Sequence, residues 1–158
     1  MSERHYSIDT SAILDGHIRY YSPDVFPGIW SRLGALIDAG RLFAPDIVID
    51  ELKKKLDEAH RWAKGHSRLA VPLEKDVQLA ATEVVNQYPK LIDNRPGRDA
   101  AADPFVIGLA RARGLTVVTG ERETGSLGRP NIPDVCKALK VPCFSMLDLF
   151  RHEAWKLV

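Results

Sequence analysis

The sequence lacks the features that mark secreted, membrane or strongly charged proteins. Only two of its 158 residues are cysteines, Cys136 and Cys143, too few for a disulfide scaffold, so both are expected to be reduced thiols. No run of about 18 apolar residues predicts a spanning helix, and MSERHYSID has no signal-peptide core. The formal net charge is only +1, so affinity for nucleic acid must come from a local patch. We therefore expect one cytoplasmic domain, residues 1–158.

Several familiar ligand motifs are also missing. The sequence has no G-x-G-x-x-G and no P-loop, which argues against a standard dinucleotide or nucleotide phosphate site. Its five histidines include no H-E-x-x-H, and the two cysteines lack C-x-x-C spacing, so a zinc site is not expected. Any chemistry must therefore come from other residue types.

What the sequence does contain is an alternation of short apolar strands and amphipathic helices. Hydrophobic residues make up 45% and charged residues 27%, a globular mixture. The pattern predicts a parallel sheet covered on both faces, in an α/β fold. Strands are expected at 6–8, 42–44, 115–119 and 141–144. Helices are expected at 11–20, 26–39, 45–62, 74–88, 103–113, 134–139 and 146–155, with Gly40 and Gly114 as helix ends and IDNRPGRD as a loop.

Acidic residues stand at the points where such a sheet would place its functional groups, outside the carboxyl ends of the strands. Asp9 follows the first strand, and Glu121 lies two residues beyond Thr119 at the end of another. Asp103 opens a helix and Glu51 lies within one. If these four converge, their mutual repulsion requires a cation. Mg²⁺ or Mn²⁺ prefers oxygen ligands and activates water for phosphodiester hydrolysis.

Each acid also has an ordinary structural interpretation. Asp9 and Asp103 stand where an N-cap would, and Asp103 is followed by a proline suited to the first helical position. Thr10 or Ser11 can take the capping role instead, which would free Asp9. Glu51 is correctly spaced for an i,i+4 ion pair with Lys55. Only the combination favours a metal site.

Four segments, in this order, resemble the PIN domain, and within it the PIN-like toxin branch (VapC-like). They are IDTSAIL, PDIVIDEL, DAAADPFVIGLARARGLTVVTGE and NIPDVCKAL, and the resemblance spans about Tyr6 to Leu149. It implies a three-layer α/β/α sandwich with a short, mostly parallel central sheet. It also implies a Mg²⁺- or Mn²⁺-dependent endoribonuclease, commonly the toxin of a toxin–antitoxin pair, with RNA as substrate, an antitoxin as partner and a tendency to form a homodimer.

The resemblance also assigns roles to residues. Asp9, Glu51 and Asp103 match the family's metal-binding acids, and Glu121 stands where the family usually has aspartate. A second-site carboxylate would come from Glu121, Glu123 or Asp134. Ser11 and Thr119 match small hydroxyl positions that orient acids or water. The expected chemistry is in-line attack of a metal-bound water on an RNA phosphate.

Arginines in the flanking loops are the candidate RNA contacts. Arg98, Arg122 and Arg129 flank Asp103 or Glu121 and are expected to contact phosphates. A catalytically silent RNA- or protein-binding module on the same fold remains the alternative. A phosphatase with Asp9 as nucleophile would normally have an acid at position 11, where Ser11 stands, and a receiver domain would have a lysine after the late strand.

Overall fold

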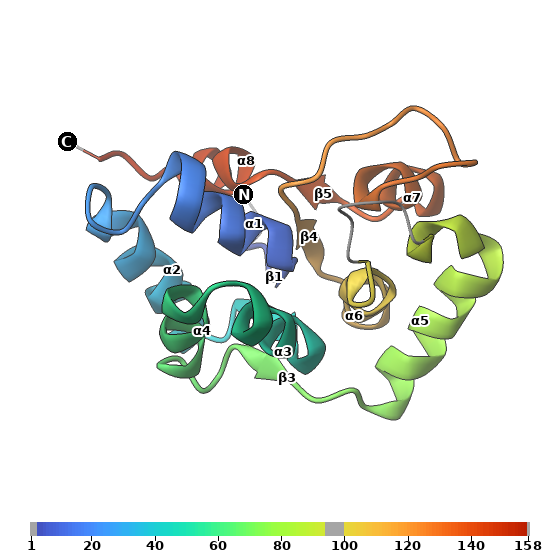
Figure 1. Ribbon diagram of the computed structural model, residues 1–158, viewed down its shortest axis with the longest axis horizontal. Helices are drawn as coiled ribbons and strands as arrows, with labels where there is room; N and C mark the ends of the chain where they lie inside the picture. Colours follow the sequence, from blue (N-terminus) through green and yellow to red (C-terminus); the bar gives the residue numbers. More distant parts are fainter. Residues whose placement is uncertain (1–2, 94–99, 158) are drawn as a thin grey trace.

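A five-stranded parallel sheet forms the centre of the computed structural model, which describes residues 3–93 and 100–157 (Figure 1). The strands are β1 (Tyr6–Ile8), β2 (Leu42–Pro45), β3 (Ala70–Val71), β4 (Thr116–Val118) and β5 (Cys143–Phe144), in the order β3-β2-β1-β4-β5. All four pairings are parallel. The expected α/β class is confirmed.

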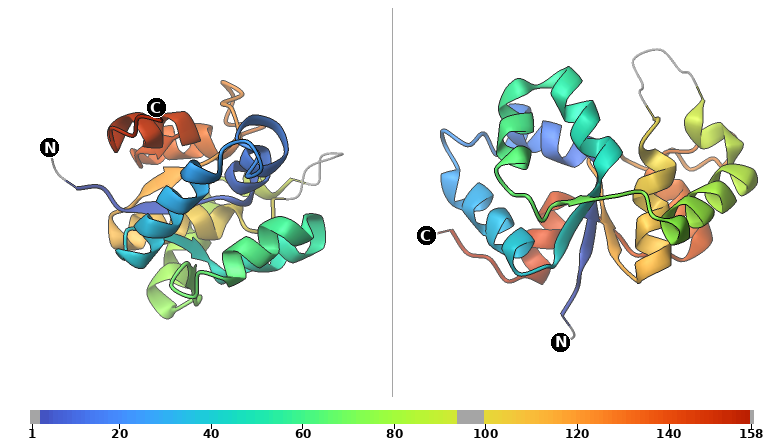
Figure 2. Two further views of the ribbon diagram at one scale, coloured as in Figure 1. Left: turned by 90° about the vertical axis from the view of Figure 1, so that its left-hand side faces the viewer. Right: turned by 90° about the horizontal axis from the view of Figure 1, so that it is seen from below.

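Helices cover both faces of this sheet (Figures 1 and 2). One face carries α1 (Thr10–Asp15), a π-helix (Gly16–Tyr20), α2 (Pro27–Asp38), α3 (Asp46–Lys55), α4 (Asp57–Lys64) and α8 (Met146–His152). The other carries α5 (Lys75–Gln87), a 3-10 helix (Pro89–Ile92), α6 (Asp103–Arg113) and α7 (Ile132–Leu139). Burial on both faces explains why the central strands are apolar without alternation.

The register of the two central strands decides which residues meet at the sheet edge. Tyr6 pairs with Thr116 and Ile8 with Val118, so β1 and β4 end level with one another. The Asp9 N–H donates to the Val118 carbonyl at 2.8 Å and extends this pairing by one residue. Asp9 and Thr119 therefore leave the sheet side by side, because parallel strands point in the same direction.

Most of the predicted elements are present, and two differences concern β3 and the helix predicted at 45–62. β3 was not predicted, because two residues carry too little pattern to be read as a strand. The single helix expected at 45–62 is two helices, since Leu56 is extended with φ −155° and ψ 105°. The boundary separates three lysines that suit a helix C-terminus from Asp57 and Glu58, which suit an N-terminus.

Two glycines end helices as expected. The loop predicted at IDNRPGRD lies largely outside the described residues. Gly40 and Gly114 have φ values of 71° and 68°, the left-handed region that favours glycine at a helix end. In the predicted loop IDNRPGRD, Ile92 belongs to the 3-10 helix, and positions 94–99 lie outside the described residues.

Cys136 and Cys143 are free thiols, as expected from their number. Within 3–93 and 100–157, no helix is long and apolar enough to cross a membrane.

An aromatic cluster on the α2 side encloses a buried histidine. The His17 ring lies with its centroid 3.9 Å from that of Trp30 and 6.2 Å from that of Trp62. Among the residues that the structure describes, none is hydrogen-bonded to either ring nitrogen of His17, and burial lowers the pKa of this side chain. The imidazole is therefore neutral near physiological pH and acts as a packing element.

The contact between α5 and α6 depends on the absence of a side chain at Gly108. A Cβ at this position would stand 2.8 Å from the Ala81 backbone nitrogen and 3.0 Å from its Cα. We expect Gly108→Ala to lower the free energy of unfolding by about 1–3 kcal/mol, because the helices must separate. Urea denaturation measures this change.

The matched control is Gly28→Ala in α2, where the nearest atom to an added Cβ is Leu157 Cδ2 at 3.9 Å. Alanine favours the helix over glycine, so this variant should keep or gain up to about 1 kcal/mol. Equal stability of the two variants would contradict the packing argument.

Candidate functional site

Asp9 lies at the carboxyl end of β1, at the N-cap position of α1, but its side chain makes no capping hydrogen bond. Instead, Ser11 Oγ donates to Asp9 Oδ2 at 2.6 Å and Thr119 Oγ1 donates to the same oxygen at 3.1 Å. The hydroxyls of Ser11 and Thr119 are themselves 3.3 Å apart. Asp9 therefore occupies the N-cap position, and its carboxylate is held by the hydroxyls of Ser11, in α1, and Thr119, just after β4.

Burial dominates the electrostatics of Asp9, which is only 3% exposed. Desolvation raises the pKa of its carboxyl, and the hydrogen bonds from Ser11 and Thr119 offset only part of this effect. Among the described residues, no cationic side chain forms an ion pair with Asp9. A carboxylate in this environment gains strongly from a bound cation.

Glu51 projects from α3 toward the same edge of the sheet and is 6% exposed. Its Oε2 accepts a hydrogen bond from Thr10 Oγ1 at 2.6 Å, and its Oε1 accepts from the Ala102 N–H at 3.2 Å. Glu51 thus joins the residue after Asp9 to the residue before Asp103. The expectation that Thr10 or Ser11 caps α1 is wrong, because both hydroxyls are bound to acids.

Asp103 is the first residue of α6, and Ala102 is the N-cap, so the N-cap role expected for Asp103 is wrong by one position. Its side chain is 3% exposed. The helix N-terminus favours a carboxylate at this point. Asp9, Glu51 and Asp103, called here the acid site, are thus three buried acids on neighbouring segments at one edge of the sheet.

Glu121 lies apart from these three, in the loop after β4. Its Oε1 accepts a hydrogen bond from the Ile132 N–H at 2.9 Å, at the start of α7, and its own N–H donates to Thr119 Oγ1 at 3.1 Å. The side chain is partly exposed. Glu121 therefore touches the acid site through Thr119, while its carboxylate holds the N-terminus of α7.

Asp134 organises the loop between β4 and α7. Its carboxylate accepts from the backbone N–H groups of Thr124, Gly125 and Asn131 at 2.8–3.1 Å, and from Thr124 Oγ1 at 3.1 Å. Burial opposes its ionisation, but these donors outweigh that effect and lower the pKa of Asp134. Glu123, the other candidate, is exposed on the same loop.

The sequence predicts that four carboxylates converge in one small volume. In the structure the predicted acids lie less close together than that. Within residues 3–93 and 100–157, no group of three or more His, Cys, Asp or Glu side chains is placed so that it could hold a metal ion. Asp9 and Glu51 turn instead toward hydroxyl and N–H donors. Thr10 was expected only as a helix cap, and its hydrogen bond to Glu51 was not predicted. The feature of the sequence that could have indicated it is the position of Thr10 next to Asp9 in IDTS.

Of the candidate RNA contacts, Arg122 lines two hollows next to Glu121. Arg122 is exposed and lines both hollows, of about 510 and 220 Å³, together with Thr119 and Glu121. Arg129 is exposed further along the same loop. Arg98 lies outside the described residues, so its predicted contact is not placed.

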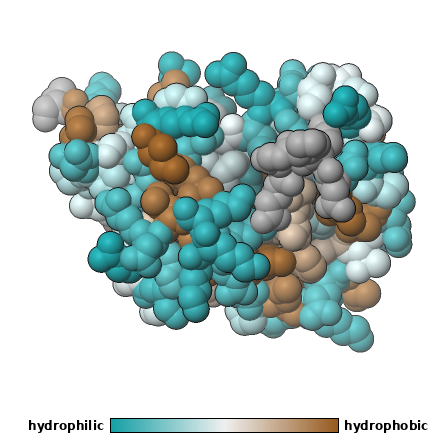
Figure 3. Space-filling view, in the orientation of Figure 1, coloured by the Kyte–Doolittle hydropathy of each residue, from teal (hydrophilic) through white to brown (hydrophobic). Residues whose placement is uncertain are grey.

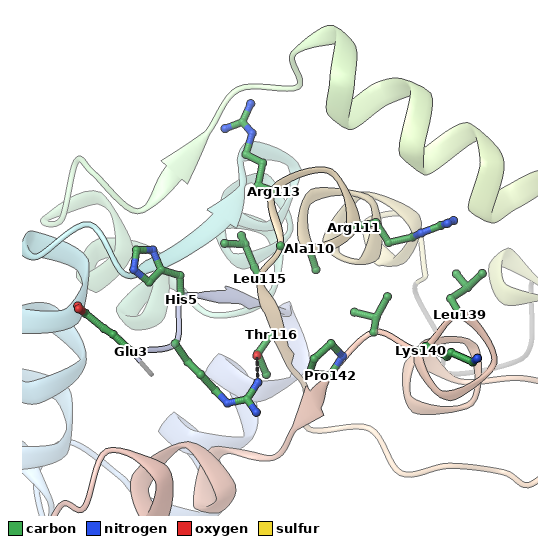
Figure 4. A pocket seen from close by; sticks show the side chains of 13 residues that line it. Glu3, His5, Ala110, Arg111, Arg113, Leu115, Thr116, Leu139, Lys140 and Pro142 are labelled. Atoms are coloured by element: carbon green, nitrogen blue, oxygen red, sulfur yellow. Dashed lines mark hydrogen bonds between the residues drawn. The ribbon is translucent and has the colours of Figure 1, made fainter. Parts of the chain in front are cut away.

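Another hollow, of about 640 Å³, lies at the opposite edge of the sheet (Figure 4). Its arginines turn outward: Arg113 pairs with Asp76 at 3.2 Å and Arg111 with Glu83 at 3.7 Å, both on α5. Arg4 donates to Thr116 Oγ1 at 2.8 Å. These cations do not converge on a common point, so the hollow is a poor candidate for chemistry.

Solved structures of other proteins show which fold the chain has, and a family model shows its family. Thirteen chains of solved structures match, among them a chain in the crystal structure of DNA-bound VapBC from Salmonella typhimurium. That match has a TM-score of 0.52 and 13% identity, and covers 91% of this chain and 99% of that one. The fold is therefore a VapC-like PIN fold, as the resemblance implied.

The family follows from the sequence. A family model described as "Domain of unknown function (DUF4411)" matches residues 6–157, so the chain belongs to the DUF4411 family. No curated protein matches the sequence.

Proposed function

We propose that this protein is a divalent-metal-dependent endoribonuclease that hydrolyses RNA phosphodiesters. The observation that carries the proposal is Asp9, a carboxylate 3% exposed at the carboxyl end of a parallel sheet and without a cationic partner in the described part of the chain. Glu51 and Asp103 are buried on the neighbouring segments. A VapC-like PIN fold supports the same function by analogy.

The donor chemistry of the acid site fits a hard divalent ion. Mg²⁺ and Mn²⁺ take carboxylate oxygens, and a cation beside Asp9 would relieve the cost of its burial. Asp9, Glu51 and Asp103 would hold the ion, which when bound supplies an activated water and stabilises charge on the phosphate. Loading would require these carboxylates to turn from their present donors, since they do not form a ready-made group.

The remaining residues have supporting roles in this proposal. Ser11 and Thr119 hold Oδ2 of Asp9, which fixes the direction of its other oxygen. Glu121 is the fourth acid that we favour, because its backbone is bonded to Thr119. Asp134 already accepts four hydrogen bonds, so its role in the proposal is to hold the loop. Arg122 and Arg129 would contact the RNA.

We place this activity in a toxin–antitoxin pair, with a cognate antitoxin as partner, in the cytoplasm and with a homodimer as the working unit. The support is the likeness to a chain of VapBC, a complex whose structure was solved with DNA bound. Co-expression with the product of an adjacent small gene, followed by co-purification and a growth assay, tests this part. Absence of a complex and of growth arrest would contradict it.

A cleavage assay tests the nuclease activity itself. The purified chain should cleave single-stranded RNA with Mg²⁺ or Mn²⁺, lose the activity in EDTA, and regain it when the metal is restored. A catalytically silent module is the second candidate, favoured by the lack of a ready-made metal group. It would bind RNA or protein without cleaving RNA under any of these conditions.

A further inference from the structure

A small hollow of about 220 Å³ opens directly beside the acid site. It lies where the end of α1, the π-helix, the loop after β4 and the start of α8 meet. Thr119, whose hydroxyl is 3.1 Å from Asp9 Oδ2, is part of its wall. Anything bound in the small hollow is therefore held next to the proposed chemistry.

The small hollow has an apolar and aromatic wall. Tyr20 and Leu147, which line it, are 56% and 43% exposed. The face seen in the space-filling view is mostly hydrophilic, with small hydrophobic patches (Figure 3). Exposed aromatic side chains beside a polar cleft are suited to stack against a planar ring.

The π-helix explains how Tyr20 reaches the surface at this point. The Tyr21 N–H donates to the Gly16 carbonyl at 2.9 Å, an i to i−5 bond that widens the turn. Tyr21 is fixed from behind, because Trp30 Nε1 donates to its carbonyl at 2.6 Å. The wall of the small hollow is thus formed by a fixed Tyr21 and a freely exposed Tyr20.

Three charged residues, Asp15, Glu121 and Arg122, line the small hollow, and the Glu121 carboxylate accepts from the Ile132 N–H at the start of α7. Asp15 borders it, and within the part of the chain that the structure describes its carboxylate has no hydrogen-bond or ion-pair partner. Arg122 stands on another wall. Gly120 lies between them, and a Cβ there would stand 2.6 Å from Asp15 Oδ2 and 2.9 Å from the Ser11 carbonyl. Glycine therefore keeps this edge open.

We propose that the small hollow binds one unpaired guanine of the RNA substrate, adjacent to the phosphodiester at the acid site. This inference rests on the proposed nuclease function, which it extends to substrate choice. Tyr20 stacks on the base, Asp15 accepts hydrogen bonds from its edge, and Arg122 donates to its oxygen and ring nitrogen acceptors.

The size of the small hollow favours a base of a polymer over a free metabolite. Pockets that enclose whole small-molecule ligands usually measure about 300–1,000 Å³, and this one is smaller, at about 220 Å³. Its continuity with Thr119 and Glu121 matches a nucleotide whose phosphate lies at the acid site. Single-stranded RNA presents unstacked bases that enter such pockets.

The charges select guanine among the four bases. A carboxylate only accepts hydrogen bonds, and guanine offers two adjacent donors, N1–H and the N2 amino group. Adenine and cytosine place a ring acceptor beside their amino group, which would repel the second carboxylate oxygen, and uracil offers one donor. Arginine is the usual partner of guanine O6 and N7.

Fluorescence anisotropy tests this inference without any cleavage. Labelled tetranucleotides UUGU, UUAU, UUCU and UUUU are titrated with the full chain in EDTA. We expect UUGU to bind about tenfold more tightly than the others, from the discrimination that one bidentate contact provides. Asp15→Asn and, independently, Arg122→Gln should remove this preference. Asp38→Asn, an exposed aspartate at the end of α2, should keep it.

Tyr20 gives a second readout. Tyr20→Ala should weaken binding of all four oligonucleotides by about tenfold, and Tyr20→Phe should retain it, because the ring and not the hydroxyl stacks.

Three results would overturn the inference. They are equal binding of the four oligonucleotides by the unmodified chain, no binding of any of them, and a guanine preference that survives Asp15→Asn and Arg122→Gln. Binding in EDTA does not require cleavage. A guanine preference without nuclease activity would therefore refute only the proposed function, and cleavage without a preference only this inference.

Discussion

Replacing Asp9 by asparagine is expected to abolish metal-dependent RNA cleavage, with a loss of about a thousandfold or more. Asparagine keeps the size of the side chain and one oxygen, but it removes the negative charge that would hold the cation. A bound ion contributes several kcal/mol to the transition state, and each 1.36 kcal/mol is a factor of about ten in rate. Single-turnover cleavage of one labelled RNA measures this loss.

The same substitution should stabilise the metal-free protein. Burial raises the pKa of Asp9, so its ionised form is disfavoured in the folded state at neutral pH relative to the unfolded chain. Removing the charge should therefore raise the free energy of unfolding, by about 0.5–2 kcal/mol. Loss of activity together with gained stability distinguishes a functional carboxylate from a structural one, which would lose both.

Asp38→Asn is the matched control for this experiment, since Asp38 is an exposed aspartate near the opposite edge of the sheet. It should leave cleavage unchanged and alter stability by less than about 0.5 kcal/mol. Cleavage by the folded Asp9→Asn variant at the rate of the unmodified chain would exclude Asp9 from the chemistry.

Asp134→Asn is expected to have the largest effect on stability of any single carboxylate substitution considered. An amide nitrogen cannot accept from the N–H groups of Thr124, Gly125 and Asn131, so at least one of these part-buried donors is left unpaired. Charge-assisted bonds and the cost of an unpaired group together predict a loss of about 3 kcal/mol. Urea denaturation at neutral pH measures it.

The pH dependence of this effect has a definite sign. Because the folded-state pKa of Asp134 is lowered, its stabilisation is complete above the unfolded pKa of about 3.9 and is lost as the pH falls through the folded value. The difference between the unmodified chain and Asp134→Asn should therefore shrink in acid. A difference that stays constant with pH would contradict a charge-based role.

Asp148→Asn serves as the control for Asp134→Asn. Asp148 occupies the corresponding third position of α8, but it is exposed, and its side chain accepts from the Ser145 N–H at 2.9 Å. We expect a loss of less than about 1 kcal/mol, the usual size of one capping interaction. A loss equal to that of Asp134→Asn would mean that both act only as helix caps.

The sequence was sufficient to place Asp9 and Thr119 side by side. LTVVT and the run ending at Ile8 are apolar without alternation, which predicts buried parallel strands, and residues that follow such strands share one edge of the sheet. The register confirms this, with Ile8 opposite Val118. The glycine-ended helices were predictable for a similar local reason, because Gly40 and Gly114 occupy positions with positive φ.

The orientation of polar side chains was not predictable in the same way. Thr10 and Ser11 are good capping residues, and only the three-dimensional neighbourhood shows that Glu51 and Asp9 are their partners. Asp134 stands in the first turn of α7, but most of its hydrogen-bond partners lie up to 10 residues earlier, in a loop with no regular pattern. Hydrogen-bond partners of this kind depend on loop conformation, which hydrophobic periodicity does not encode.

The central claim is tested most directly by Mn²⁺ binding to the unmodified chain and to Asp9→Asn. The electron paramagnetic resonance signal of free Mn²⁺ measures this binding. The claim is that the buried, cation-free carboxylate of Asp9 is completed by a divalent ion. We expect the unmodified chain to remove Mn²⁺ from solution with a saturable stoichiometry, to release it to excess Mg²⁺, and to lose this binding in Asp9→Asn. Equal binding by both proteins, or none by either, would contradict the claim.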